Sequence, residues 1–199
     1  MEEKKMVRKK RVFWMNLVLV FALIAGLVLP AEGVNAAGKS EKKKVLVVYF
    51  SATGTTKSAA GKVKKATGGK LYQIKPAKKY TSADLDYNND DCRANKEQND
   101  ENSRPKIKGK VKNIRKYDVI FVGYPIWWGK EPMIIRTFLE SYNLKGKKIV
   151  PFCTSGGSGI SGSMKGVKAA AKGAKVVSGK DLTNSSAKSV QKWAKKKMK

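Results

Sequence analysis

The sequence contains no histidine, few cysteines and few acidic residues. The absence of histidine excludes catalytic triads built on that residue and removes the commonest ligand of catalytic zinc. The two cysteines, Cys92 and Cys153, are too few for a disulfide scaffold. Against 15 Asp and Glu stand 43 Lys and Arg, so the formal net charge is +28. A charge this high attracts polyanions through long-range fields and needs no shaped site to do so.

The start of the chain has the order of segments found in secretory signal peptides. A cluster of Lys and Arg ends at Arg11, and an uncharged apolar run follows from Leu17 to Ala31. The small residues Val34 and Ala36 then stand at the spacing of a signal-peptidase site. This order predicts export of the remainder of the chain.

The pattern divides the chain into three parts. We expect a signal peptide over residues 1–36, a linker over 37–43 and a folded domain over 44–199. The alternative is an N-terminal membrane anchor, in which residues 12–31 stay in the bilayer and the preceding basic residues stay on the cytoplasmic side. Both readings place the domain outside the cytoplasmic membrane, either in the cell envelope or in the extracellular space.

From Lys44 onward, apolar runs alternate with segments of helical periodicity. The runs predict strands at 44–50, 70–75, 117–125, 147–155 and 175–179, and the periodic segments predict helices at 55–67, 131–142, 161–174 and 186–198. Such alternation is typical of an α/β fold with a doubly wound parallel sheet. The polar stretch from Pro76 to Asn113 is expected to be an irregular excursion with a short helix.

The loop after the first expected strand has the composition of a phosphate site. Ligands of doubly wound sheets bind beyond the carboxyl ends of the strands. There the segment Ser51–Thr56, with the sequence SATGTT, supplies four hydroxyl groups and a glycine at the start of a helix. Free backbone N–H groups at a helix N-terminus bind anions, and Gly54 lets the backbone come close. The loop lacks the G-K-[ST] motif, which excludes a nucleotide-hydrolysing P-loop. The alternative to a phosphate site is an ordinary helix cap.

Two further loops follow strands that end at the same edge of the sheet. Tyr124–Gly129 carries two adjacent tryptophans, which can form a wall for a planar ring or, alternatively, pack in the core or against a partner. Thr154–Gly159 carries three glycines, which let the backbone lie close to a ligand or form a flexible turn. The three loops together indicate a ligand with a phosphate at one end and a planar ring at the other.

This combination of motifs resembles the flavodoxin family. YFSATGTT is similar to its FMN-phosphate loop, and VIFVGYPIWWG and IVPFCTSGGSG are similar to the flavin-flanking loops of members with a P-I-W-W motif. The resemblance covers residues 44–197. It implies a flavodoxin-like three-layer sandwich with a five-stranded parallel sheet of order 2-1-3-4-5 and helices on both faces, and it implies FMN as the cofactor.

The resemblance also assigns roles along the three loops. It implies that the FMN phosphate is held by Ser51, Ala52, Thr53, Gly54, Thr55 and Thr56. It implies that the isoalloxazine is lined by Pro125, Ile126, Trp127 and Trp128, and on its other side by Thr154, Ser155, Gly156, Gly157 and Gly159. We expect Trp127 to stack on the ring, because it is nearer to the strand end. No side chain is expected to act as an acid or a nucleophile.

The expected function is electron transfer by an FMN-binding protein outside the cytoplasmic membrane, as a carrier more than as a turnover enzyme. The alternatives are an FMN-dependent NAD(P)H:quinone-type oxidoreductase and a cationic envelope-binding protein without flavin. Flavodoxins are typically acidic and cytoplasmic, so the basic charge and the leader leave the redox partner open. The charge favours an anionic redox partner or an anionic envelope over nucleic acid, because the basic residues are scattered; simple solubility is the alternative.

Three smaller expectations concern charge and cysteine. We expect lysines around the flavin to make its reduction potential less negative. Cys153 is expected to be a buried small hydrophobe, with a Cys92–Cys153 disulfide as the alternative in an oxidising compartment. The acidic stretch between Asp84 and Glu101 is read as a solvated surface segment, because its spacing matches no calcium loop.

Overall fold

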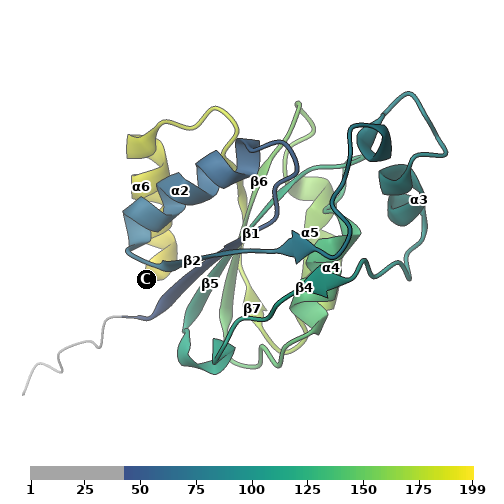
Figure 1. The fold of residues 1–199 in the computed structure, drawn as a ribbon. Helices are drawn as coiled ribbons and strands as arrows, with labels where there is room; N and C mark the ends of the chain where they lie inside the picture. Colours follow the sequence, from purple (N-terminus) through teal and green to yellow (C-terminus); the bar gives the residue numbers. More distant parts are fainter. Residues whose placement is uncertain (1–42) are drawn as a thin grey trace, which may run out of the picture. The chain divides into compact units, whose positions relative to one another are not determined.

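The computed structural model describes residues 43–199, which form three layers around a parallel sheet (Figure 1). The predicted signal peptide or anchor, and the linker before Lys43, lie outside the described residues. The main strands are β1 (Val45–Tyr49), β2 (Lys70–Gln73), β5 (Val119–Pro125), β6 (Lys148–Thr154) and β7 (Lys175–Val176). Their order is β2-β1-β5-β6-β7, all parallel, which confirms the predicted order 2-1-3-4-5.

Two helices cover each face of the sheet. Figure 1 shows α2 (Thr55–Thr67) beside α6 (Ala187–Met198) on one face, and α4 (Met133–Glu140) with α5 (Met164–Ala170) on the other. Between residues 43 and 199, no helix combines the length and the apolar character that crossing a bilayer requires. The helices agree with the sequence patterns to within a few residues, except that the third begins with the 3-10 turn η3 (Ser161–Ser163) before α5.

The sheet divides the core into two clusters because successive side chains of a strand point to opposite faces. Val45, Val47 and Tyr49 of β1 pack in the cluster under α2 and α6. Leu46 and Val48 pack in the larger cluster under α4 and α5. Both faces are therefore covered, which explains why the strands read as continuous apolar runs in the sequence.

The polar excursion contains more regular structure than its composition indicates. It includes α3 (Arg93–Asn99), the 3-10 turn η1 (Ala83–Leu85) and β4 (Ile107–Lys108), which pairs antiparallel with β3 (Lys75–Pro76). A second 3-10 turn, η2 (Ile114–Lys116), follows directly after the excursion. Both cysteines are buried free thiols, so the disulfide alternative is wrong. The Cys92 sulfur accepts a hydrogen bond from the Asn95 N–H at 3.4 Å and caps α3.

Only the first two residues of the last expected strand, 175–179, form a strand, β7, and a second short strand follows just beyond it. Both β7 and β8 (Lys180–Asp181) pair with β6, and the residues between them leave the ladder. The reason lies on β6, where Pro151 has no N–H to donate at the point where the ladder would continue.

A glycine in β5 permits close packing between two neighbouring strands. A Cβ atom on Gly123 would lie 2.1 Å from Cζ of Phe152, so Gly123→Ala displaces a buried ring. We expect this substitution to lower the free energy of unfolding by about 1–3 kcal/mol, as overpacking does. Gly61→Ala in α2 is the control, because nothing lies within 4 Å of its added Cβ and helix propensity should raise stability by about 0.5–1 kcal/mol. Urea unfolding measures both, and equal effects would contradict the packing argument.

Candidate functional site

The carboxyl ends of β1, β5 and β6 border a cleft with a volume of about 430 Å³. Its size lies within the range of ligand pockets. From the expected set it is lined by Ala52, Thr53, Thr55, Thr56, Pro125, Ile126, Trp127, Thr154, Ser155 and Gly156. Leu85, Tyr87 and Thr183 also line it and were not expected. Of the remaining expected residues, Gly157 lines an adjoining pocket of about 620 Å³, while Ser51, Gly54, Trp128 and Gly159 line neither.

The loop after β1 leaves backbone donors free at the start of α2. Gly54 is the N-cap with φ 102°, and no side chain caps the helix. The first helical hydrogen bond runs from Ser58 N–H to Gly54 C=O at 3.0 Å, so the preceding N–H groups of the first turn have no helical acceptor. Ser51 accepts from Gly54 N–H through its hydroxyl oxygen at 3.1 Å and thereby shapes the loop. The geometry suits an anion, and no acidic residue in the first turn opposes one.

A buried hydrogen bond joins the first loop to the third. The hydroxyl groups of Thr56 and Thr154 lie 2.8 Å apart, and both side chains are buried. The hydroxyl of Ser155 then donates to Asp181 Oδ2 at 2.6 Å and accepts from the N–H of Gly159 at 3.1 Å. The glycine-rich loop is therefore folded around Ser155 and is not a free turn. Gly159 contributes to this loop structure through its N–H and does not line the cleft.

Asp181 accepts hydrogen bonds that hold this loop in place. Burial acts to raise its pKa, but hydrogen bonds donated by Ser155 and Thr183 hold the pKa of Asp181 below its ordinary value. The neighbouring Cys153 is fully buried, as expected, and burial together with Asp181 raises the pKa of its thiol to about 12. The thiol stays protonated at neutral pH and contributes no nucleophile.

The two tryptophans have different surroundings. Trp127 is 5% exposed, lines the cleft and packs edge-on against Phe50 and Tyr80, so both the core and the ligand interpretations apply to it. Trp128 has φ 45°, an uncommon value for a residue with a side chain, and its ring stacks on Tyr87 with centroids 4.3 Å apart. Tyr87 is 55% exposed. The identity of the ring that stacks on a flavin stays a prediction.

Comparison with known proteins identifies the family. The family model described as Flavodoxin matches residues 44–197. The chain belongs to the flavodoxin family. No curated protein matches this flavodoxin, but solved structures do.

Three solved structures illustrate the similarity. Proteins assigned as flavoproteins from Bacteroides eggerthii DSM 20697 and Bacteroides uniformis ATCC 8492 are 50% and 44% identical, each with a TM-score of 0.74. The first comparison covers 77% of this flavodoxin and 96% of the other chain, and the second covers 78% and 99%. A flavoprotein from Lactobacillus acidophilus NCFM in complex with FMN is 25% identical over 70% of this chain and 93% of that one, with a TM-score of 0.57.

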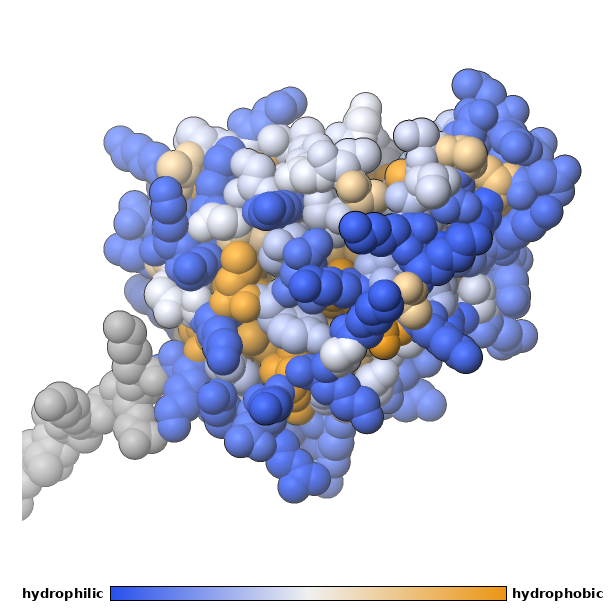
Figure 2. Space-filling model, viewed as in Figure 1, coloured by the Kyte–Doolittle hydropathy of each residue, from blue (hydrophilic) through white to orange (hydrophobic). Residues whose placement is uncertain are grey.

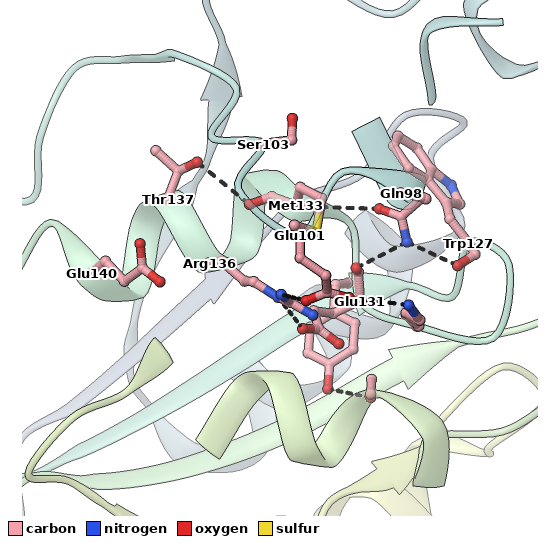
Figure 3. A network of polar contacts seen from close by, with 12 residues as sticks. Gln98, Glu101, Ser103, Trp127, Glu131, Met133, Arg136, Thr137 and Glu140 are labelled. Carbon is pink, nitrogen blue, oxygen red and sulfur yellow. Dashed lines mark hydrogen bonds and ion pairs between the residues drawn. The ribbon is translucent and has the colours of Figure 1, made fainter. Parts of the chain in front are cut away.

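In this flavodoxin a buried glutamine from the excursion holds the tryptophan loop. Gln98 of α3 is 2% exposed. Its side-chain amide donates to the backbone C=O groups of Trp127 and Glu131 at 3.1 and 3.2 Å, and its Oε1 accepts from Met133 N–H at 3.2 Å (Figure 3). All three partners lie in or just after the loop, so one side chain sets its path between β5 and α4.

A buried ion pair stabilises the same loop between β5 and α4. Glu131 is 1% exposed, and its Oε1 accepts from Arg136 Nε at 2.8 Å; Arg136 also pairs with Glu101 of the excursion (Figure 3). Burial raises the pKa of Glu131, while Arg136 acts to lower it. A Cβ on Gly166 of α5 would lie 1.8 Å from Glu131 Oε1, so the ion pair fits only because α5 has a glycine there.

The residues that line the cleft are uncharged. No lysine is among them, and the segment that supplies Leu85 and Tyr87 carries Asp84 and Asp86 beside them. Any effect of lysines on a bound flavin would therefore come from charges beyond the lining residues, and the less negative reduction potential stays a prediction.

Replacing the buried amide tests how strongly the tryptophan loop depends on the excursion. Gln98→Met keeps the volume but leaves the C=O of Glu131 and the N–H of Met133 without partners, whereas the C=O of Trp127 keeps the hydrogen bond from Lys130 N–H. We therefore expect the free energy of unfolding to fall by about 2 kcal/mol. FMN affinity should fall by at least about tenfold, which corresponds to about 1.4 kcal/mol. Urea unfolding and flavin fluorescence titration measure the two effects. The neighbouring, exposed Asn99→Met is the control; it removes only the hydrogen bond from Asn99 to the Asn95 side chain, so it should lower the stability much less and leave FMN affinity unchanged. Equal results for both variants would refute the role of Gln98.

The lowered pKa of Asp181 gives the loop a pH dependence. A carboxyl whose pKa is lower in the folded state stabilises the fold above its unfolded pKa of about 3.9, and this contribution disappears as the pH falls through the folded value. Asp181→Asn should lower the free energy of unfolding by about 1–2 kcal/mol at pH 7 and have a smaller effect below pH of about 3. Thermal unfolding across this range measures it, with the exposed Asp91→Asn as the control. A difference between wild type and Asp181→Asn that does not change with pH would contradict the assignment.

Proposed function

We propose that this chain is an FMN-binding electron-transfer protein that acts outside the cytoplasmic membrane. The observation that carries the proposal is the single cleft that combines the uncapped start of α2 with the indole of Trp127. Membership of the flavodoxin family and the similarity to an FMN complex support the same cofactor.

The residues present fit the parts of FMN. The free N–H groups and threonine hydroxyls after β1 suit its phosphate, because they are neutral donors at a helix N-terminus. Trp127, Ile126 and Pro125 present apolar surface to a planar ring, and Ser155 and Gly156 line the same cleft. Bound FMN would supply the one- and two-electron chemistry, and the chain's own contribution is to bind and orient it.

The chemistry of the cleft favours a carrier over a turnover enzyme. Among its described lining residues, Tyr87 is the only titratable one, and burial raises the pKa of its hydroxyl above the ordinary value. No side chain of the cleft is thus placed to exchange a proton with a substrate near neutral pH. An electron carrier needs no such group.

A second candidate is an FMN-dependent NAD(P)H:quinone-type oxidoreductase. The pocket beside the cleft favours it, because the two share Ser155, Gly156 and Thr183 and a volume of about 620 Å³ leaves room for a second substrate. Steady-state turnover with NADH or NADPH and a quinone separates the candidates, since a carrier alone should show almost none.

The exported location rests on the order of basic cluster, apolar run and small residues before position 37. The family match begins at residue 44, so the domain and the leader are separate segments of the sequence. N-terminal sequencing of the protein recovered from outside the cytoplasmic membrane would show whether the leader is removed.

The FMN proposal is tested on the protein without residues 1–36. The match to the Bacteroides eggerthii structure covers 96% of that chain and 77% of this one, which supports the expectation that the domain folds without residues 1–36. We expect a yellow protein that binds one FMN with a Kd below about 1 μM and quenches its fluorescence. A sample that stays colourless and leaves added FMN unquenched would refute the proposal.

A charge placed in the phosphate loop locates the site. Thr55→Glu puts a carboxylate beside the phosphate and should weaken FMN binding by at least about 100-fold, as expected of like charges a few ångströms apart at the protein surface. Gly61→Glu adds the same charge to α2 at an open position away from the cleft and should leave the affinity almost unchanged. Equal losses in both variants would contradict the assigned loop.

A further inference from the structure

The amino ends of the strands carry a dense group of lysines at the end of the domain opposite the cleft. The parallel register brings together the starts of four strands, where Lys44, Lys70, Lys148 and Lys175 stand. The seven residues of β5 separate this end from the cleft by roughly 20 Å, at about 3.3 Å per residue.

The helices on one face add more lysines at the same end. The last turn of α2, which leads directly into β2, holds Lys64 and Lys65, and the last turn of α6 holds Lys195–Lys197. Lys43 Nζ donates to the backbone C=O of Met198 at 2.9 Å, which places the end of α6 beside the start of β1. We call these lysines at the strand starts and in the two last turns the lysine end. Figure 2 shows hydrophilic side chains along the lower border of the domain, with some hydrophobic atoms exposed above them.

Acidic residues do not balance the lysine end. Among residues 43–199, Asp118 is the only acid at these strand starts or in these two last turns, and it accepts a hydrogen bond from Lys44 N–H at 2.7 Å. Glu140, in the last turn of α4, is paired with Arg104. Seven of the described acids lie instead in the excursion between Asp84 and Glu101. The domain is therefore electrically polar along the strand direction.

Mutual repulsion shows how crowded the lysine end is. Burial and the nearby Lys43, Lys175 and Lys197 lower the pKa of Lys148. Repulsion between like charges this close lowers the stability of the folded domain. An anionic surface that approaches these lysines would reduce the repulsion and so stabilise the fold.

We propose that the lysine end docks on the anionic phospholipid headgroups of a membrane, with the cleft facing away from the lipid. The covalent path of the chain favours this partner over a soluble polymer. The apolar run ends at Ala31, so eleven residues join it to Lys43, and they span at most about 40 Å when extended. The chain thus enters the domain at the lysine end, and in the anchored alternative this link would keep that end within about 40 Å of the bilayer. The inference does not depend on the bound flavin.

Vesicle binding tests the proposal. The protein without residues 1–36 is sedimented with vesicles of phosphatidylcholine alone, or of phosphatidylcholine with one third phosphatidylglycerol, at low and high salt. We expect binding to the anionic vesicles only, and its loss at high salt. Binding to both kinds of vesicle, or binding that salt does not weaken, would overturn the proposal.

Matched charge variants separate the lysine end from net charge. The test variant carries three substitutions in the lysine end, Lys65→Gln, Lys175→Gln and Lys196→Gln. Its partition coefficient for anionic vesicles should fall by about 100-fold, since each surface lysine contributes roughly a factor of five. The control carries Lys78→Gln, Lys79→Gln and Lys96→Gln, three exposed lysines outside the lysine end. It has the same net charge and should lose much less; equal losses would refute a defined docking surface.

Site-specific labelling measures the orientation. Because Cys92 and Cys153 are buried, a single introduced cysteine is the accessible thiol. A fluorophore on Lys172→Cys, three residues before β7, should be quenched by a headgroup-labelled lipid, whereas one on Asn88→Cys beside Tyr87 should not. Equal quenching would overturn the orientation.

Two controls make the outcomes separable. Retention by soluble polyphosphate without binding to anionic vesicles would overturn the membrane proposal in favour of an anionic polymer. FMN fluorescence titration of the same samples shows whether the flavin site is intact, so failure of docking and failure of FMN binding are read independently.

Discussion

The parallel pairing of β1, β5 and β6 is the constraint on which the rest of the structure depends. Because the three strands start in register, their carboxyl ends meet at one edge and bring together loops that are about 70 and 30 residues apart in the sequence. The hydrogen bond between Thr56 and Thr154 then joins two of these loops directly. The same register collects the lysines at the opposite edge, so one backbone pattern accounts for both ends of the domain.

The excursion makes contacts that fix the loop after β5, which the sheet alone does not fix. Gln98 accounts for three backbone groups of the loop after β5, and the pair of Glu131 with Arg136 supports its far end. Trp128 lies in a tight turn closed by two backbone hydrogen bonds between Trp127 and Lys130, and there it adopts a backbone angle that residues with side chains seldom have. A polar segment that reads as a loop is thus part of the scaffold of the site.

Local patterns of apolar strands and of glycine-rich strand ends predicted the main strands and most of the cleft, whereas the strand order was implied by the resemblance to the flavodoxin family. It did not predict Tyr87, since a tyrosine among aspartates and asparagines has no periodicity to place it. Thr183 was missed because the last strand was expected to end at 179, before the β8 pairing that brings it to Ser155. The buried role of Gln98 depends on contacts about 30 residues away, which composition does not show.

The interruption opposite Pro151 has a consequence for how the protein behaves at high concentration. An outer strand with a continuous row of unpaired N–H and C=O groups is a template on which another copy can add a strand. Here that border of the sheet consists of two pieces of two residues each, separated by a gap, so no such row exists there. The proline that shortens the last strand therefore removes this border of the sheet as a template for edge-to-edge pairing.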